Sequence, residues 1–211
     1  MHSPFPPTNP CYLRLLPESY DPNGKHMEYY DSQGKLFARI AKAHKTGNAF
    51  MHLFDVFQPA KDVYAELRAT DNTLLMTTTA YRGENKHDCR VEIHAPDGTL
   101  FGVLRDASYG ADFHLPDETV IGGARRPSDR PTEPMEVVHT YTDAAGRTVG
   151  TCDRRYPDQD HSLLDFLVHD GVNTSGMPVQ TVTLEPDIDP TLRTFLLLFP
   201  ALQHLRYSRS G

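Results

Sequence analysis

The sequence predicts an all-β fold, a closed antiparallel β-barrel of about twelve strands around one buried C-terminal helix. Two observations carry this prediction. Short runs of alternating apolar and polar residues are separated again and again by turn residues, and the chain ends in a segment, Phe195–Phe199, that is apolar on every side. At 211 residues the chain has a length typical of one all-β domain.

The strand–turn–strand units are recognised by Asp and Gly at the turn. Residues 89–94 and 99–104 flank Pro96-Asp97-Gly98, and residues 137–141 and 148–150 flank a turn at 143–146. Asp and Gly favour such turns because they tolerate the left-handed backbone conformation that tight hairpins need. Three further turns are expected at 31–34, 71–73 and 116–118, and two more candidate strands at 166–169 and 179–184. Five hairpins and two strands give about twelve strands.

A helix is expected over about residues 190–205. Asp189 is a good N-cap and Pro190 suits the first helical position, where a missing N–H costs nothing. Such a helix would be roughly 24 Å long, which is short of the ~30 Å hydrocarbon layer of a membrane. We therefore expect it inside the barrel, whose lumen is too wide for inward side chains alone to fill.

One domain is expected. Residues 1–27 form an extended or partly ordered lead-in, because residues 1–10 hold four prolines, and residues 28–211 form a single barrel domain. No linker is expected to divide that region into two independent cores.

Composition limits the partners and the compartment. The net charge of −7 argues against nucleic-acid binding, which depends on contacts between basic side chains and phosphates. The three cysteines, Cys11, Cys89 and Cys152, are far apart in the sequence, and no export signal precedes them. We therefore expect free thiols, a cytoplasmic location and no transmembrane segment.

The hairpin units and the approach to the helix resemble those of the tubby C-terminal, phospholipid scramblase and LURP-related superfamily. The resemblance rests on residues 95–102, residues 142–150 and the Asp187-Ile188-Asp189 sequence before the helix. It implies a twelve-stranded barrel around a hydrophobic helix. Scramblases also have an acidic calcium loop before the helix, whereas residues 176–181 here contain no carboxylate. Two aspartates fall well short of the about six to eight oxygen ligands of a Ca²⁺ site.

Two basic segments are candidate binding sites. The resemblance to tubby domains, which bind phosphoinositide headgroups through Lys and Arg, suggests a cluster of Arg39, Lys42 and Lys45. A second set, Arg125, Arg126 and Arg130, lies in a proline-rich stretch and could bind a phosphate group or be an ordinary solvated loop.

No catalytic or metal site is predicted. The eleven histidines show no ligand spacing, the chain has no GxSxG motif, and three core-packed thiols explain the cysteines better than a nucleophile does. No motif indicates a cofactor.

These observations favour a non-enzymatic barrel that binds a lipid headgroup, a small apolar ligand or a protein partner. A structural or oligomeric interaction module is the first alternative, and it predicts a flat apolar surface patch. An enzyme with its site on the barrel rim is the second, and it requires reactive side chains gathered from separate loops.

Overall fold

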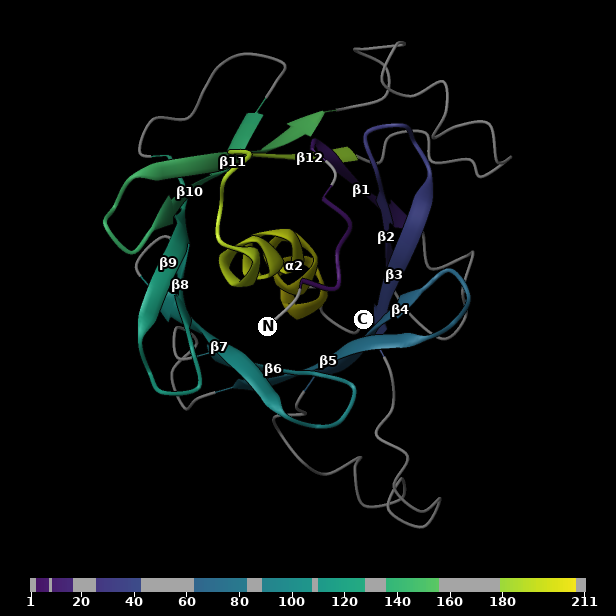
Figure 1. Ribbon diagram of the computed structural model, residues 1–211, viewed down its shortest axis with the longest axis horizontal. Coiled ribbons are helices and arrows are strands. Elements are labelled where there is room, and N and C mark those ends of the chain that lie inside the picture. Colours follow the sequence, from purple (N-terminus) through teal and green to yellow (C-terminus); the bar gives the residue numbers. More distant parts are fainter. Residues whose placement is uncertain are drawn as a thin grey trace.

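A computed structural model of the protein describes residues 3–7, 9–16, 26–42, 63–82, 89–107, 110–127, 136–155 and 179–207. These residues form a closed barrel in which every strand pairs with its neighbours in antiparallel orientation, and the predicted fold class is confirmed (Figure 1). The elements are β1 (Cys11–Leu16), β2 (His26–Tyr30), β3 (Leu36–Lys42), β4 (Val63–Ala69), β5 (Leu74–Arg82), β6 (Cys89–His94), β7 (Leu100–Ala107), β8 (Gly110–His114), β9 (Val120–Arg125), β10 (Glu136–Asp143), β11 (Thr148–Arg155), β12 (Val179–Leu184) and α2 (Pro190–Tyr207).

The five predicted hairpins are confirmed, and all five have the same turn geometry. In the β6–β7 hairpin the Ala95 N–H donates to the Thr99 carbonyl at 2.9 Å, and the Gly98 N–H donates to the Ala95 carbonyl at 2.9 Å. The fourth residue of the turn is left-handed, with φ of 84° at Gly98. Glycine accepts this conformation because it has no Cβ, which is why Asp-Gly predicts the turn.

The first strand lies within the segment that the sequence suggests as a lead-in. In β1 the side chains of Cys11 and Leu13 are buried in the barrel, with 1% and 0% exposure, and β1 closes the barrel by pairing with β12 and β2. The candidate strand at 179–184 is confirmed as β12, whereas 166–169 lies outside the described residues.

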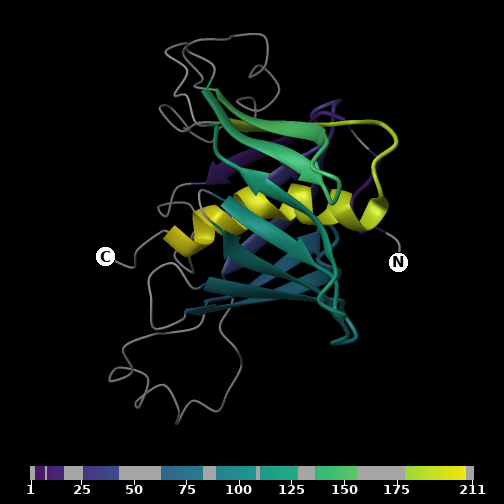
Figure 2. The ribbon, with the colours of Figure 1, turned by 90° about the vertical axis from the view of Figure 1, so that its left-hand side faces the viewer.

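Helix α2 runs through the lumen of the barrel, as Figures 1 and 2 show from two directions. It begins where the sequence predicts, since the Asp189 Oδ1 atom accepts hydrogen bonds from the Thr191 and Leu192 N–H groups at 2.8 and 3.0 Å. Residues 192–202 of the helix are all buried. The helix supplies the apolar volume that the barrel wall cannot supply alone.

Aromatic side chains join the helix to the wall formed by β7 and β8. Phe195 stacks on Phe113 with ring centroids 5.4 Å apart and packs against Phe101 at 5.5 Å. One turn later Phe199 meets Phe113 at 5.7 Å. Each ring that is buried in this way contributes roughly 1.5–3 kcal/mol of hydrophobic stabilisation.

The opposite side of the lumen is filled by the N-terminal segment, residues 3–7 and 9–10, which lies between α2 and strands β1 to β3 (Figure 1). The Phe5 ring is 4% exposed and packs against Tyr29 and Phe37, with centroid distances of 5.3 and 6.0 Å. The helix and this segment together plug the barrel.

Candidate ligand-binding site

The five hairpin turns lie along one rim of the barrel, and an aspartate stabilises each of them. An aspartate Oδ1 atom accepts the N–H of the fifth turn residue in every case; the pairs are Asp31 with Lys35, Asp71 with Thr73, Asp97 with Thr99, Asp117 with Thr119, and Asp143 with Arg147. Hydrogen bonds from these backbone N–H groups lower the pKa of Asp71, Asp97 and Asp117. These carboxylates therefore have a structural role.

A hollow of about 480 Å³ lies at this rim, beside the start of α2. Its size is within the range of about 300–1,000 Å³ that is typical of small-molecule sites. It is formed by three parts of the chain that are far apart in sequence, namely the β8–β9 hairpin, the β10–β11 turn and the connection from β12 to α2. Its lining residues are Leu115, Ile121, Asp143, Ala144, Ala145, Arg147, Val149, Asp187, Ile188, Asp189, Thr191 and Leu192. We call it the rim hollow.

The rim hollow combines apolar and charged residues. Five aliphatic side chains contribute to its lining: Leu115, Ile121, Val149, Ile188 and Leu192. Three carboxylates and one guanidinium contribute the charges, from Asp143, Asp187, Asp189 and Arg147, so the formal charge of the lining is −2 (three negative, one positive). A molecule with an apolar body and a positive group matches this lining.

Two of the three carboxylates already have partners. Asp143 accepts from the Ala145 and Arg147 N–H groups at 3.0 Å and from Arg147 Nε at 3.1 Å. Desolvation raises the pKa of Asp143, but the hydrogen bonds from Arg147 and Ala145 outweigh it and the pKa falls below its ordinary value. Asp189 caps α2. Asp187 is exposed and has no hydrogen bond to any described residue, so it remains available to a ligand.

The predicted basic cluster on β3 is only partly described. Arg39 lies on the outer face of β3 with its side chain 53% exposed, and its Nε donates to Glu28 Oε1 at 2.9 Å. Lys42 is the last residue of β3, while Lys45 lies outside the described residues. A cluster of these three cations stays a prediction.

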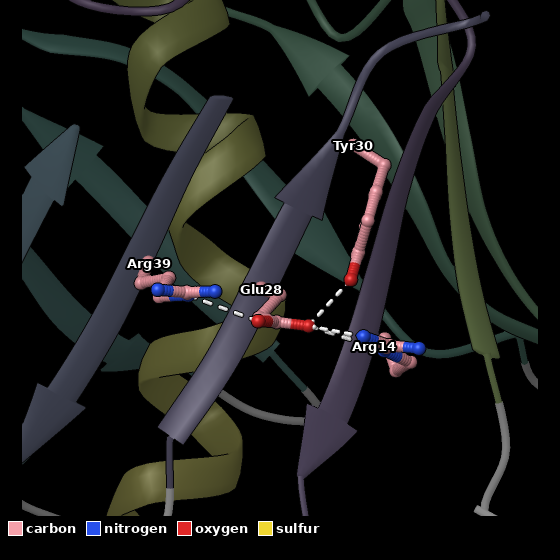
Figure 3. A network of polar contacts seen from close by, with 4 residues as sticks. All are labelled: Arg14, Glu28, Tyr30 and Arg39. Atoms are coloured by element: carbon pink, nitrogen blue, oxygen red, sulfur yellow. Dashed lines mark hydrogen bonds and ion pairs between the residues drawn. The ribbon is translucent and has the colours of Figure 1, made fainter. Parts of the chain in front are cut away.

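Glu28 is the centre of a polar network on this outer face, shown in Figure 3. Arg14 on β1 donates to Glu28 Oε2 through Nε at 3.1 Å and Nη2 at 2.6 Å, and the Tyr30 hydroxyl donates to the same oxygen. Burial alone would raise the pKa of Glu28, but the hydrogen bonds from Tyr30 and Arg14 outweigh it and lower the pKa. Arg39 therefore extends a pre-formed network.

The second basic segment lies on the opposite wall. Arg125 ends β9, six strands from β3 in either direction around the barrel. Its guanidinium donates to the Ala111 carbonyl at 2.7 Å and forms an ion pair with Asp112. Arg126 is exposed and Arg130 lies outside the described residues. Arg39 and Arg125 thus lie on opposite walls of the barrel, and anion binding at either segment stays a prediction.

In the described part of the chain, two features bear on reactivity: groups of metal-binding side chains and the accessibility of the thiols. No three His, Cys, Asp or Glu side chains among the described residues could hold a metal ion together. The three cysteines are buried and form no disulfide. Burial raises the pKa of Cys11, and it raises the pKa of Cys152 to about 12, so both stay thiols at neutral pH.

A comparison with protein-family models, curated proteins and solved structures found no match to this chain. Within the described residues, no helix has both the length and the apolar character needed to cross a membrane.

The rim hollow is the site that sequence reasoning missed. Asp187 and Asp189 stand out in the sequence only as the two aspartates before the helix, whereas their neighbours in space come from turns that are about forty to seventy residues earlier in the chain. The order of the hairpins could have indicated this site. In an antiparallel barrel every second connection between strands lies at the same rim, and the connection from the last strand to the helix lies at the rim of the five hairpin turns.

Proposed function

We propose that this protein is a non-enzymatic binding barrel whose ligand is a small molecule with an apolar body and one positively charged group, held in the rim hollow. The observation that carries the proposal is the lining of the hollow, five aliphatic side chains beside three carboxylates and one guanidinium. Aliphatic side chains favour burial of an apolar body, and Asp187 is free to accept hydrogen bonds from an ammonium group.

Two observations rank this function above the alternatives. An interaction module needs a large exposed apolar patch, and Val120, at 46% exposure, is the one exposed large hydrophobic residue among those described. A rim enzyme needs a titratable group poised for chemistry, and the carboxylates of the rim hollow that have partners serve to hold turns and the helix cap.

We also propose that the chain is a distant relative of the tubby, scramblase and LURP-related superfamily. A closed barrel of twelve strands around a C-terminal helix supports this proposal. The rim hollow is separate from the basic segments through which that resemblance suggests headgroup binding.

Calorimetric titration with octylamine, octanol and octanoate tests the function, because these probes share a chain and differ in charge. We expect octylamine to bind most tightly and octanoate least, since the lining is negative. Absence of binding by all three would exclude a small-ligand function for the hollow.

Two variants locate the site. Asp187→Asn should weaken octylamine binding about five- to tenfold and leave octanol unchanged, as expected for the loss of one charge-assisted hydrogen bond. Glu185→Gln is the matched control, because Glu185 is an exposed carboxylate two residues away that does not line the hollow. Ala145→Trp should block the hollow, and it adds a fluorescent reporter to a chain without tryptophan. Equal octylamine affinity in all three variants would place the ligand elsewhere.

A further inference from the structure

A group of buried polar side chains lies inside the barrel, beneath the N-terminal segment. Cys11 on β1 and Cys152 on β11 both pair in register with Val182 of β12, so the two thiols lie on either side of this residue on the inner face. Tyr29 is on the adjoining strand β2, Tyr141 is on β10, and Arg193 extends from α2. We call these five side chains the lumen cluster.

The strands that carry four of the members, β2, β1, β11 and β10, are neighbours in the barrel wall, with β12 alone between β1 and β11. Burial raises the pKa of Tyr141, and the neighbouring Cys152 and Tyr29 raise it further. Burial likewise raises the pKa of Cys11, while Arg193 lowers it. The lumen cluster is therefore one polar site contributed by five separate elements.

Two hydroxyl groups of the cluster lack an oxygen or nitrogen partner. Tyr29 and Tyr141 are both 0% exposed, and neither hydroxyl has an oxygen or nitrogen partner; the hydroxyl of Tyr141 faces only the thiol of Cys152, a weak partner. Buried hydroxyls are almost always paired, because an unpaired one loses its hydrogen bonds to water without replacement. Two such groups in one cluster can therefore act as hydrogen-bond donors to a bound group.

The N-terminal segment covers the cluster with two complementary groups. The Phe5 ring packs on the Tyr29 ring, and the carbonyl oxygen of Pro6 accepts a hydrogen bond from Arg193 Nη2 at 3.3 Å. A third contact, from Thr194 Oγ1 to Ser3 Oγ at 2.8 Å, fixes the segment on the helix. Adjacent residues thus present an aromatic ring and a hydrogen-bond acceptor to the lumen.

The charge of the cluster favours an anionic group. Arg193 is 9% exposed, and Glu28 is the one carboxylate among the buried residues described, on the outer face of the barrel. A guanidinium in such surroundings, with two tyrosine hydroxyls as further donors, suits a carboxylate.

We propose that the lumen cluster and the space that Phe5 fills bind a small carboxylic acid that carries an aromatic ring, and that the N-terminal segment occupies this site in its absence. The carboxylate takes the place of the Pro6 carbonyl at Arg193 and accepts from the hydroxyls of Tyr29 and Tyr141. The aromatic ring takes the place of Phe5. The segment is then a competitor within the same chain, and this site is distinct from the rim hollow.

Fluorine NMR of 3-(4-fluorophenyl)propanoate tests the competition. The probe is titrated with the full chain and with its Phe5→Ala variant, and line broadening gives the two dissociation constants. Phe5→Ala should bind at least about tenfold more tightly, because the binding-competent state is no longer suppressed by the ring. Equal affinity for the two chains would overturn the proposal. Thermal unfolding followed by circular dichroism checks that the variant is folded, and Phe5→Leu replaces it if it is not.

Further variants identify the head group and the site. In the Phe5→Ala background, Arg193→Gln should abolish measurable binding and Tyr141→Phe should weaken it severalfold. The matching amine, 3-(4-fluorophenyl)propylamine, should bind at least tenfold more weakly, as expected for a cation facing a guanidinium. Equal binding of acid and amine would overturn the proposal. Binding that is lost in Ala145→Trp but kept in Tyr141→Phe would place the acid in the rim hollow and overturn this inference, whereas the octylamine titration decides the proposed function separately.

Discussion

Gly102 on β7 lies directly against the Phe195 ring on α2. A Cβ at Gly102 would be 2.4 Å from Cζ of Phe195 and 2.5 Å from the carbonyl oxygen of His114. Gly122 on β9 has the same relationship to Leu192, with a Cβ-to-Cδ1 distance of 2.7 Å. These two glycines let the helix lie close to one wall of the barrel, and the wider space on the other side is where the N-terminal segment enters.

Gly102→Ala should therefore destabilise the barrel by about 2–4 kcal/mol, since neither a packed ring nor backbone can move aside cheaply. Urea unfolding followed by circular dichroism measures the change. Gly98→Ala is the control, because its added Cβ meets nothing within 4 Å. This control should lower the free energy of unfolding by only about 1–2 kcal/mol, because a side chain with a Cβ is strained in the left-handed backbone conformation. Equal losses in the two variants would contradict close packing of the helix on β7.

Glu28→Gln should lower the free energy of unfolding by about 3–5 kcal/mol. It removes the negative charge that the Arg14 and Arg39 guanidiniums share, and it leaves the buried Arg14 without a counter-charge. Urea unfolding at pH 7 measures the loss. Glu66→Gln is the matched control, because Glu66 and Arg68 form an ion pair whose side chains are 24% and 37% exposed. That exposed ion pair should contribute about 1 kcal/mol or less to the free energy of unfolding. A Glu28 variant no less stable than the Glu66 variant would show that the network contributes little.

The barrel could be predicted because its signals are local. Each Asp-Gly turn specifies a hairpin within a few residues, and Asp189-Pro190 specifies the start of the helix. Strand β1 was not predicted, because it follows a proline-rich segment and Tyr12 and Leu16 interrupt its apolar–polar alternation.

The sites could not be predicted because their residues meet only in space. Asp187 and Ala145 line one hollow although they are forty-two residues apart. The pairing of Arg14 with Glu28 depends on the register of β1 against β2, which one sequence does not specify. Likewise, nothing in the sequence shows that the hydroxyls of Tyr29 and Tyr141 lack oxygen or nitrogen partners.

Leu197→Asp should unfold the protein, because Leu197 is 0% exposed and an unpaired carboxylate cannot be accommodated in the plug of the barrel. We expect a loss of at least about 4–5 kcal/mol, visible as loss of the cooperative thermal transition in circular dichroism. Val120→Asp, at an exposed apolar position, is the control and should melt normally. A folded, soluble Leu197→Asp variant would refute the burial of the helix.

His139 gives the barrel an acid-sensitive core. Its side chain is 1% exposed, neither ring nitrogen has a hydrogen-bond partner, and its ring packs edge-on against Phe199 at 4.9 Å. Burial lowers the pKa of His139 from 6.5 to about 3, and the positive charges of Arg126 and Arg154 act in the same direction. The imidazole is therefore neutral in the folded protein at any pH well above 3.

Since the unfolded chain takes up a proton at His139 below pH 6.5 and the folded chain does not until about pH 3, acid favours unfolding in this window. The free energy of unfolding therefore falls as the pH is lowered from 6.5 towards 3, by up to about 5 kcal/mol from this residue. His139→Leu should remove this contribution, so that its free energy of unfolding, measured in urea from pH 7.5 to 4, falls less steeply than that of the unmodified chain. His114→Leu, at a partly exposed position, is the control for the loss of a histidine side chain. Parallel curves for the His139 variant and the unmodified chain would mean that the imidazole is not buried in its neutral form.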